Sequence, residues 1–258
     1  MVFLSQCFKE KDRMINLLKE SNFMENEFVL IIDFGSQVTQ LIARRLRELK
    51  VYCEIHPFNN VHDESLKKFN PKAIILSGGP ASVLDDNAPK PPSSIYDLEV
   101  PILGICYGQQ IMMQMLGGSV VSGSGTSEFG KSFVNINNKS KDIKFLEGLF
   151  LDQGKEEVWM SHGDHVATIP KDFEVYGISE NAPFAIVGNE KKHFYGVQFH
   201  PEVIHTLNGK ELIKNFLKLS NFSFNWSMQS YLQQSVVEIK MQVGNKKVIC
   251  ALSGGVDS

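Results

Sequence analysis

The sequence has few cysteines and lacks any long apolar run. Its 258 residues include four cysteines, Cys7, Cys53, Cys106 and Cys250, which form no C-x-x-C pair. This spacing favours neither a disulfide framework nor a zinc site. No stretch approaches the roughly 18–20 apolar residues that a membrane span needs, and residues 1–27 lack the apolar core of a signal peptide. We therefore expect a reduced protein of the cytoplasm, with no membrane partner and no bound metal.

The sequence also lacks an excess of charge of either sign. Lysine and arginine total 26 residues against 29 aspartates and glutamates, which gives a net charge of −3. Proteins that bind nucleic acid usually present a strongly basic surface, so we expect no nucleic-acid partner. Hydrophobic residues make up 43% of the chain and charged residues 21%, which excludes a wholly disordered protein.

Strand-like and helix-like patterns alternate in the first half of the chain. Short apolar runs typical of buried parallel strands occur at 28–32, 51–55, 73–76 and 101–105, and helical spacing occurs at 38–49 and 108–116. Strand-like segments then follow one another without helices, at 131–136, 157–160, 173–179, 184–188 and 193–199. Two helices, at 207–219 and 226–243, and a strand at 247–252 complete the pattern. The pattern predicts an α/β fold, with an open, mostly parallel sheet flanked by helices and extended by antiparallel strands.

A candidate nucleophile lies between the fourth predicted strand and the helix after it. The segment Gly104-Ile-Cys106-Tyr-Gly108 has the form of a nucleophile elbow with a thiol in place of the hydroxyl. Its glycines allow a sharp turn and a close approach of substrate. Cys106 would also stand at a helix N-terminus, where unpaired amides favour the thiolate. A buried structural cysteine is the alternative interpretation.

A candidate base and its orienting carboxylate lie further along the chain. His200 ends a strand-like run and is followed by Pro201 and Glu202. Pro201 biases His200 towards extended geometry, so alternation can place His200 and Glu202 on the same side. Cys106, His200 and Glu202 would then act as nucleophile, base and orienting group.

An oxyanion would need hydrogen-bond donors close to the nucleophile. The glycine turn Ser77-Gly-Gly-Pro80 follows the third predicted strand and can present backbone N–H groups. The N–H of Tyr107, directly after the nucleophile, is its natural partner. Taken alone, the same turn is an ordinary tight turn.

These motifs together resemble the class I (triad) glutamine amidotransferases, whose fold is flavodoxin-like. The resemblance rests on Ser77-Gly-Gly-Pro80, Gly104-Ile-Cys-Tyr-Gly-Gln-Gln110 and Gln198-Phe-His-Pro-Glu202. Three further segments resemble the glutaminase half of the GMP synthetases within that class: Ile32-Asp-Phe-Gly-Ser-Gln37, Met160-Ser-His-Gly-Asp164 and His200-Pro-Glu-Val-Ile-His-Thr206.

The resemblance implies that glutamine is hydrolysed to glutamate and ammonia without a cofactor. Cys106 would attack the side-chain amide, His200 would transfer protons, and Glu202 would hold His200 in place. The oxyanion would be bound by the backbone N–H groups of Gly79 and Tyr107. The glutamine pocket would be lined by Gln110, Ser161, His162 and Gly163, whereas Asp33, Gly35 and Ser36 would shape the first turn of the sheet rather than touch substrate.

The end of the sequence resembles the pyrophosphate loop of an ATP-pyrophosphatase domain. It follows an apolar run and consists of Ser253, Gly254, Gly255, Val256, Asp257 and Ser258. Glycines of such a loop expose amides to a phosphate. By resemblance, the complete synthetase would use ATP and Mg²⁺ to activate XMP, and ammonia would convert it to GMP in a homodimer. The expected organisation is an N-terminal extension over 1–27, a glutamine amidotransferase domain over 28–222 and the truncated start of the ATP-pyrophosphatase domain over 223–258.

Three other functions remain open from the sequence. The chain can be the glutaminase of another synthetase, such as one that makes carbamoyl phosphate or anthranilate. It can be a γ-glutamyl hydrolase with the same triad. From a different class, it can be a non-catalytic regulatory module that keeps the fold; the presence of Cys106, His200 and Glu202 argues against that class.

Overall fold

The structure is a computed structural model that describes residues 27–123, 125–137, 140, 142–150, 154–244 and 246–249. The chain divides into two compact units, one of which is Asn26–Asn225, while the other contains the residues from Trp226 onward. The expected N-terminal extension, except Glu27, and the expected pyrophosphate loop Ser253–Ser258 lie outside the described residues.

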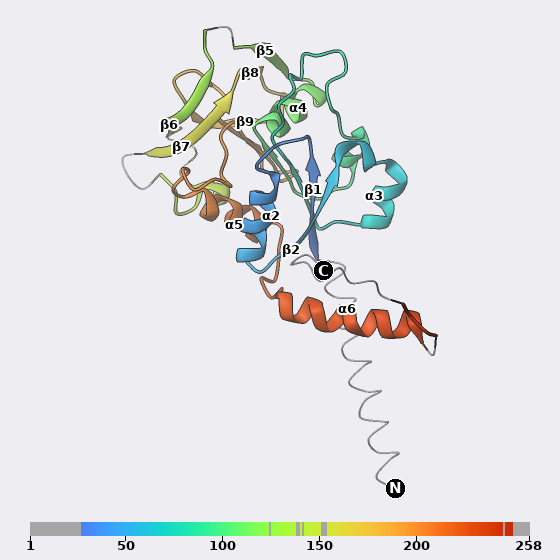
Figure 1. Ribbon diagram of the computed structural model, residues 1–258. Coiled ribbons are helices and arrows are strands. Elements are labelled where there is room, and N and C mark those ends of the chain that lie inside the picture. The colour runs from blue at the N-terminus through green and yellow to red at the C-terminus, as the bar shows by residue number, and fades with distance from the viewer. Residues whose placement is uncertain are drawn as a thin grey trace. The chain divides into compact units, whose positions relative to one another are not determined.

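The described residues of the larger unit contain a nine-stranded sheet (Figure 1). Its strand order is β2-β1-β3-β4-β11-β10-β9-β6-β7. In chain order the strands are β1 Phe28–Asp33, β2 Tyr52–Pro57, β3 Ala73–Leu76, β4 Ile102–Ile105, β6 Glu128–Ile136, β7 Lys155–His162, β9 Glu174–Ile178, β10 Ile186–Asn189 and β11 Phe194–Val197. The pairs from β2 to β11 are parallel, and the pairs from β11 to β7 are antiparallel. The predicted parallel sheet with an antiparallel extension is confirmed.

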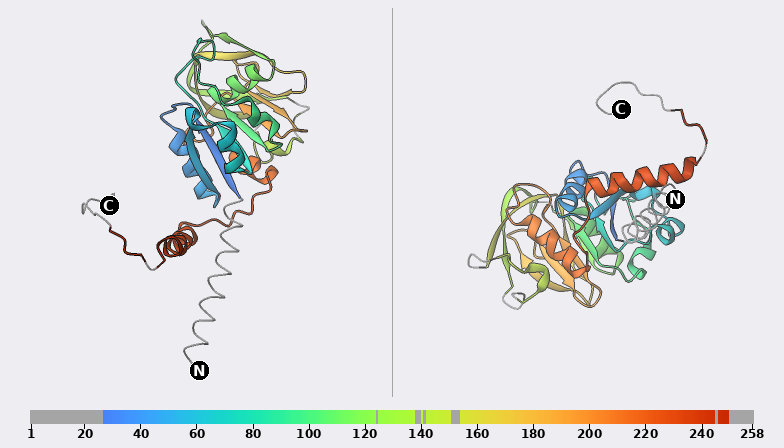
Figure 2. Two further views of the ribbon diagram at one scale, coloured as in Figure 1. Left: turned by 90° about the vertical axis from the view of Figure 1, so that its right-hand side faces the viewer. Right: turned by 90° about the horizontal axis from the view of Figure 1, so that it is seen from below.

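Helices cover both faces of this sheet (Figures 1 and 2). The helices of the larger unit are α2 Thr39–Glu48, α3 Asp63–Phe69, α4 Tyr107–Met115 and α5 Gly209–Leu219. Buried side chains of α2 and α5 belong to one hydrophobic core, and those of α3 and α4 belong to a second. Strand β1 shows why its sequence is continuously apolar: Val29 and Ile31 enter the first core, while Leu30 and Ile32 enter the second. A central parallel strand has no solvent-facing side, so polar alternation is absent.

Some elements were not predicted from the sequence. Helix α3 is one of them, and a small antiparallel sheet of β5, Ser119–Ser122, and β8, Asp164–Thr168, is another. Strand β6 begins earlier than the predicted 131–136, because it pairs with β7 from Glu128 opposite His162 to Asn135 opposite Lys155. This long ladder extends the strand through residues whose own pattern is weak.

The second unit contains helix α6, Met228–Val243, at the red end of the colour bar in Figure 2. Ser227 begins the helix by accepting a hydrogen bond from the N–H of Ser230, which is the usual N-cap arrangement. The strand predicted over 247–252 is absent from its described part, residues 247–249; an isolated strand without a hydrogen-bonded neighbour is unstable. Within the described part of the chain, no helix combines the length and apolar character that a membrane-spanning segment requires.

The burial of the central strands leads to a stability prediction. Ile75 on β3 is 0% exposed, whereas Ile204 is 75% exposed. Ile75→Ala leaves a cavity between sheet and helices and should lower the free energy of unfolding by about 2–5 kcal/mol. Ile204→Ala, the matched control, should change it by no more than about 0.5 kcal/mol. Urea denaturation of both variants measures the two values, and equal losses would contradict the described core.

Candidate active site

Cys106 occupies a sharp turn between β4 and α4. Its φ is 51° and its ψ is −108°, a conformation that a residue with a side chain rarely adopts. The glycines on either side are required by close packing. A Cβ on Gly104 would lie 2.7 Å from the backbone nitrogen of Gln109, and a Cβ on Gly108 would lie 2.2 Å from the carbonyl oxygen of Leu76. The segment therefore has the geometry of the predicted elbow.

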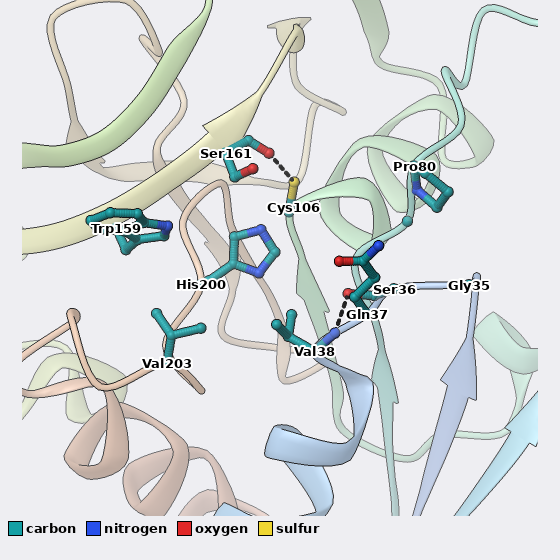
Figure 3. Close-up of a pocket in the computed structure, with 11 residues that line it drawn as sticks. Gly35, Ser36, Gln37, Val38, Pro80, Cys106, Trp159, Ser161, His200 and Val203 are labelled. Atoms are coloured by element: carbon teal, nitrogen blue, oxygen red, sulfur yellow. Dashed lines mark hydrogen bonds between the residues drawn. The ribbon is translucent and has the colours of Figure 1, made fainter.

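The pairing of β4 with β11 brings the second motif to this elbow. The two strands are parallel, and Ile105 lies opposite Val197 at their carboxyl ends. The N–H of Cys106 then donates to the carbonyl of Val197 at 2.8 Å. Because both strands end at the same edge of the sheet, the residues that follow β11 emerge beside Cys106, as Figure 3 shows for His200.

His200 lies between the Cys106 sulfur and a buried carboxylate. Its Nδ1 is 2.8 Å from Oε1 of Glu202, and Glu202 is 0% exposed. Two side chains hold the backbone of this turn. Nε of Arg45 on α2 donates to the Glu202 carbonyl at 3.0 Å, and the hydroxyl of Thr206 donates to the His200 carbonyl at 2.7 Å. The structure thus brings the three predicted triad residues together.

The surroundings of His200 favour its protonated form. Burial lowers the pKa of His200, but hydrogen bonds to Cys106 and Glu202 and the negative charge of both groups outweigh burial and raise the pKa to about 11. An imidazole that holds its proton between a sulfur and a carboxylate can deliver that proton to a leaving group. The arrangement is chemically suited to nucleophilic attack by the sulfur.

The glycine turn after β3 packs directly against these groups. A Cβ on Gly78 would lie 3.1 Å from Cε1 of His200 and 3.8 Å from Cβ of Cys106. A Cβ on Gly79 would lie 3.4 Å from Cγ of Tyr107, so the two predicted oxyanion residues are neighbours. Tyr107 is the first residue of α4, where a backbone N–H has no partner within the helix. Both predicted oxyanion residues therefore lie close to the elbow.

A cavity of about 300 Å³ opens at the elbow (Figure 3). This volume is at the lower end of the range of roughly 300–1,000 Å³ typical of small-molecule sites. The lining residues are Gly35, Ser36, Gln37, Val38, Gly79, Pro80, Cys106, Trp159, Ser161, His200 and Val203.

The loop after β1 has a larger place in the site than the sequence indicated. Asp33 shapes the turn as expected, since its Oδ1 accepts from the N–H of Gly35 at 3.0 Å and from the hydroxyl of Thr39 at 2.7 Å. Gly35 and Ser36, expected only to shape that turn, also line the cavity. The rule that ligands bind at the carboxyl ends of parallel strands would have indicated this loop.

Trp159 and Val203 were also missed, for a different reason. Trp159 lines the cavity because the turn after β11 lies against β7, where the N–H of His200 donates to the carbonyl of Trp159 at 3.0 Å. Val203 lines it because the turn after His200 folds back over the site. No local motif marks either residue.

The four residues predicted to bind glutamine lie near the elbow in different ways. Ser161 lines the cavity, and its carbonyl oxygen is 3.5 Å from the Cys106 sulfur. Nε2 of Gln110 donates to the carbonyl of Asp164 at 2.7 Å and to Oε1 of Gln198 at 3.3 Å. Their roles in binding remain predictions.

The other two face neighbouring strands and turns. The ring nitrogens of His162 lie 3.3 Å from Oε2 of Glu128 and 3.1 Å from the carbonyl oxygen of Asp164. Gly163 is in backbone contact with Gly123, since a Cβ on Gly123 would lie 1.8 Å from the Gly163 oxygen. The His162 ring thus points to Glu128 rather than into the cavity described above.

Cys53, the other cysteine that the structure describes, has none of the features of Cys106. Cys53 is buried on β2, and burial raises its pKa to about 11, so its thiol is unreactive near neutral pH. Among the residues that the structure describes, no group of three or more histidine, cysteine, aspartate or glutamate side chains could hold a metal ion.

Comparison with known families places the chain in a class. The family model described as "Glutamine amidotransferase class-I" matches residues 30–219, which are most of the chain. The chain belongs to the class I glutamine amidotransferases.

Two curated relatives carry the same name. The chain is 62% identical over 234 residues to a glutamine-hydrolysing GMP synthase of Dinoroseobacter shibae, with 91% of this chain and 44% of that protein covered. It is 54% identical over 231 residues to the enzyme of the same name from Rhizobium etli, with 89% and 44% covered. The chain thus spans less than half the length of these relatives, and it matches their glutamine amidotransferase part.

Solved structures share the fold. A candidate GMP synthase component from Thermoplasma acidophilum superposes with a TM-score of 0.65 at 28% identity, covering 81% of this chain and 98% of that one. A glutamine amidotransferase of Thermotoga maritima gives a TM-score of 0.57 at 22% identity, covering 84% and 93%. The second likeness concerns the fold alone.

The environment of His162 leads to a prediction about pH. Burial lowers the pKa of His162 below its usual 6.5, although the Glu128 carboxylate acts to raise it. The unfolded chain therefore takes up a proton on this histidine as the pH falls through about 6.5, while the folded chain resists it, so stability decreases. His162→Gln removes this contribution, and its free energy of unfolding should fall less between about pH 6.5 and pH 5. Urea denaturation at several pH values tests this, and an equally steep fall in both proteins would contradict it.

Proposed function

We propose that this chain hydrolyses glutamine to glutamate and ammonia with Cys106, His200 and Glu202 as its catalytic triad. The observation that carries the proposal is the position of His200, which lies beside the elbow cysteine on one side and is hydrogen-bonded to a fully buried carboxylate on the other. Membership in the class I glutamine amidotransferases supports the same reaction.

In this mechanism the Cys106 sulfur attacks the carbon of the side-chain amide. The amide oxygen becomes negative and accepts hydrogen bonds from the backbone N–H groups of Gly79 and Tyr107. As the tetrahedral intermediate collapses, the C–N bond breaks and His200 gives its proton to the nitrogen, which leaves as ammonia. A thioester of Cys106 with the glutamyl group remains.

Water completes the cycle. His200, now neutral, takes a proton from a water molecule that attacks the thioester carbon. The second tetrahedral intermediate releases glutamate, and the sulfur and the protonated His200 return to their starting states. Glu202 keeps Nδ1 of His200 in place throughout and stabilises the protonated ring. The hydrolysis needs no cofactor.

Glutamine would bind in the cavity at the elbow, between the loop after β1 and the end of β7. Ser161 lines this cavity. Gln110, His162 and Gly163 would complete the pocket, His162 and Gly163 through their backbone groups, since the His162 ring is directed at Glu128. These four residues are the proposed glutamine-binding set.

We further propose that this chain supplies ammonia within a GMP synthase. The high identity to proteins of that name supports this assignment. In the longer protein the ammonia would convert XMP to GMP with ATP and Mg²⁺, in a homodimer. The domain boundaries proposed from the sequence, 28–222 and 223–258, and the ATP loop Ser253–Ser258 belong to this proposal, and the loop lies outside the described residues.

Loss of the nucleophile provides the first test. Cys106→Ala should reduce glutamate release from glutamine by roughly a thousandfold or more, because removal of a nucleophile abolishes the covalent route. Cys53→Ala is the matched control: it removes a second buried cysteine, and its activity should equal that of the unaltered chain. Release is measured by coupled glutamate detection.

Two results would count against the triad. One is release that persists in Cys106→Ala. The other is a folded, unaltered chain that neither releases glutamate nor reacts at Cys106 with an electrophilic glutamine analogue. Labelling without turnover would instead assign a competent nucleophile whose hydrolysis is held back.

The carboxylate of the triad provides a separate test. Glu202→Gln keeps the size of the side chain but removes the charge that raises the pKa of His200. By analogy with other triads, kcat should decrease by roughly 10³–10⁴-fold while the chain stays folded. Steady-state kinetics and circular dichroism together check this. A decrease of less than about tenfold would show that Glu202 does not orient the base.

A further inference from the structure

Glu128 is a buried acid outside the proposed triad. It begins β6 and is 8% exposed. Its Oε1 accepts a hydrogen bond from the hydroxyl of Ser132 at 2.9 Å, and its Oε2 accepts one from the hydroxyl of Ser179 at 2.7 Å. Oε2 also lies 3.3 Å from Nε2 of His162. The carboxylate is therefore held from three directions.

The strand register directs this carboxylate at His162. Glu128 and His162 are direct cross-strand partners in the β6–β7 ladder, so their side chains leave the sheet on the same face. The His162 ring is buried, and its second nitrogen lies 3.1 Å from the carbonyl oxygen of Asp164. Glu128 thus holds the His162 ring, which in turn contacts the backbone carbonyl of Asp164.

Two short routes connect this histidine to the nucleophile. Ser161, the neighbour of His162, has its carbonyl oxygen 3.5 Å from the Cys106 sulfur. Along the second route, the Asp164 carbonyl accepts from Gln110, and Gln110 donates to Gln198, whose Nε2 is 3.7 Å from the same sulfur. A displacement of the turn Ser161–Asp164 would therefore change the contacts of the Cys106 sulfur along both routes.

We propose that Glu128 is a positioning residue that acts through His162 to hold the turn Ser161–Asp164 against Cys106 and the glutamine pocket. This inference rests on the proposed glutaminase function. Without the carboxylate, the buried His162 ring loses the partner on its Nε2 side, and the turn is held from its other side by the backbone contact of Gly163 with Gly123. The Ser161 carbonyl oxygen is then no longer held at a single position relative to the Cys106 sulfur.

The chemistry of the pair argues for positioning rather than for stability alone. Burial of polar and charged groups costs solvation, and well-packed apolar residues can often replace such groups without loss of stability. The direction of hydrogen bonds, in contrast, defines the position of a loop closely. Displacements on the order of 1 Å near reacting groups can cost about a hundredfold in rate.

A double-mutant cycle on the whole chain tests the proposal. Glu128→Ala should lower kcat/KM for glutamine hydrolysis by about tenfold to a hundredfold. Glu128→Gln, whose amide oxygen still accepts a hydrogen bond from His162, should recover most of that loss. Because both residues act in one chain of contacts, the double variant of Glu128→Ala and His162→Asn should be no worse than the worse single variant.

Ser132→Ala is the matched control. It removes a hydrogen bond to Oε1 of the same carboxylate but leaves the side facing His162 intact, so kcat/KM should change less than twofold. Thermal unfolding of every variant gives its folded fraction, and all rates are expressed per folded molecule. Additive losses in the double variant, or unchanged kcat/KM per folded Glu128→Ala, would overturn the positioning role.

Labelling separates this inference from the proposed function. The rate of reaction of Cys106 with an electrophilic glutamine analogue is measured in the unaltered chain and in both Glu128 variants; it replaces kcat/KM if hydrolysis is held back. Absence of both turnover and labelling in the unaltered chain would overturn both proposals. Normal labelling of the unaltered chain, together with equal labelling in Glu128→Ala, would overturn only the role of Glu128.

Discussion

The parallel pairing of β4 with β11 is the constraint on which the candidate site depends. It aligns Ile105 with Val197 and lets the Cys106 N–H donate to the Val197 carbonyl at 2.8 Å. That hydrogen bond helps to hold Cys106 at a φ of 51°, a conformation that costs about 1–3 kcal/mol and persists only when its surroundings impose it. The same pairing places the turn that carries His200 beside the sulfur. One ladder therefore positions both the proposed nucleophile and its proposed base.

Buried polar groups converge on the sulfur from two parts of the sheet. On the side of β11, Glu202 and His200 form a charged pair whose backbone is held by Arg45 and Thr206. On the side of β7, Glu128 and His162 contact the turn whose Ser161 carbonyl reaches the sulfur. The Glu128 carboxylate contacts Ser132 on its own strand, His162 on β7 and Ser179 after β9, whereas the Glu202 carboxylate contacts His200 within the same turn. Side chains that are held by several strands at once have well-defined positions, whereas side chains held by a loop alone would be free to move.

Much of the fold and part of the site could be predicted from local sequence. The central parallel strands β1, β3 and β4 carry enough consecutive apolar residues to be recognised alone, since both faces of such strands are covered by helices. The elbow around Cys106 could be recognised because its glycines and its cysteine are contiguous, and the steric demand on Gly104 and Gly108 comes from the turn itself and the adjacent strand. The weakly patterned elements, α3, β5 and β8, could not be predicted, because pairing and packing stabilise them more than their own residues do.

The amino-acid sequence by itself determined the order of the strands along the chain, the elbow and which groups are candidates for reaction, because these depend on residues that are close together in the chain. Only the tertiary structure decided which strands are neighbours. The insertion of β11 beside β4 brings His200 to Cys106 across more than ninety positions, and no local pattern encodes that register. The tertiary structure likewise decided that the loop Gly35–Val38 lines the cavity and that His162 faces Glu128. Such contacts arise from burial of apolar faces over the whole sheet, a long-range effect to which every strand contributes.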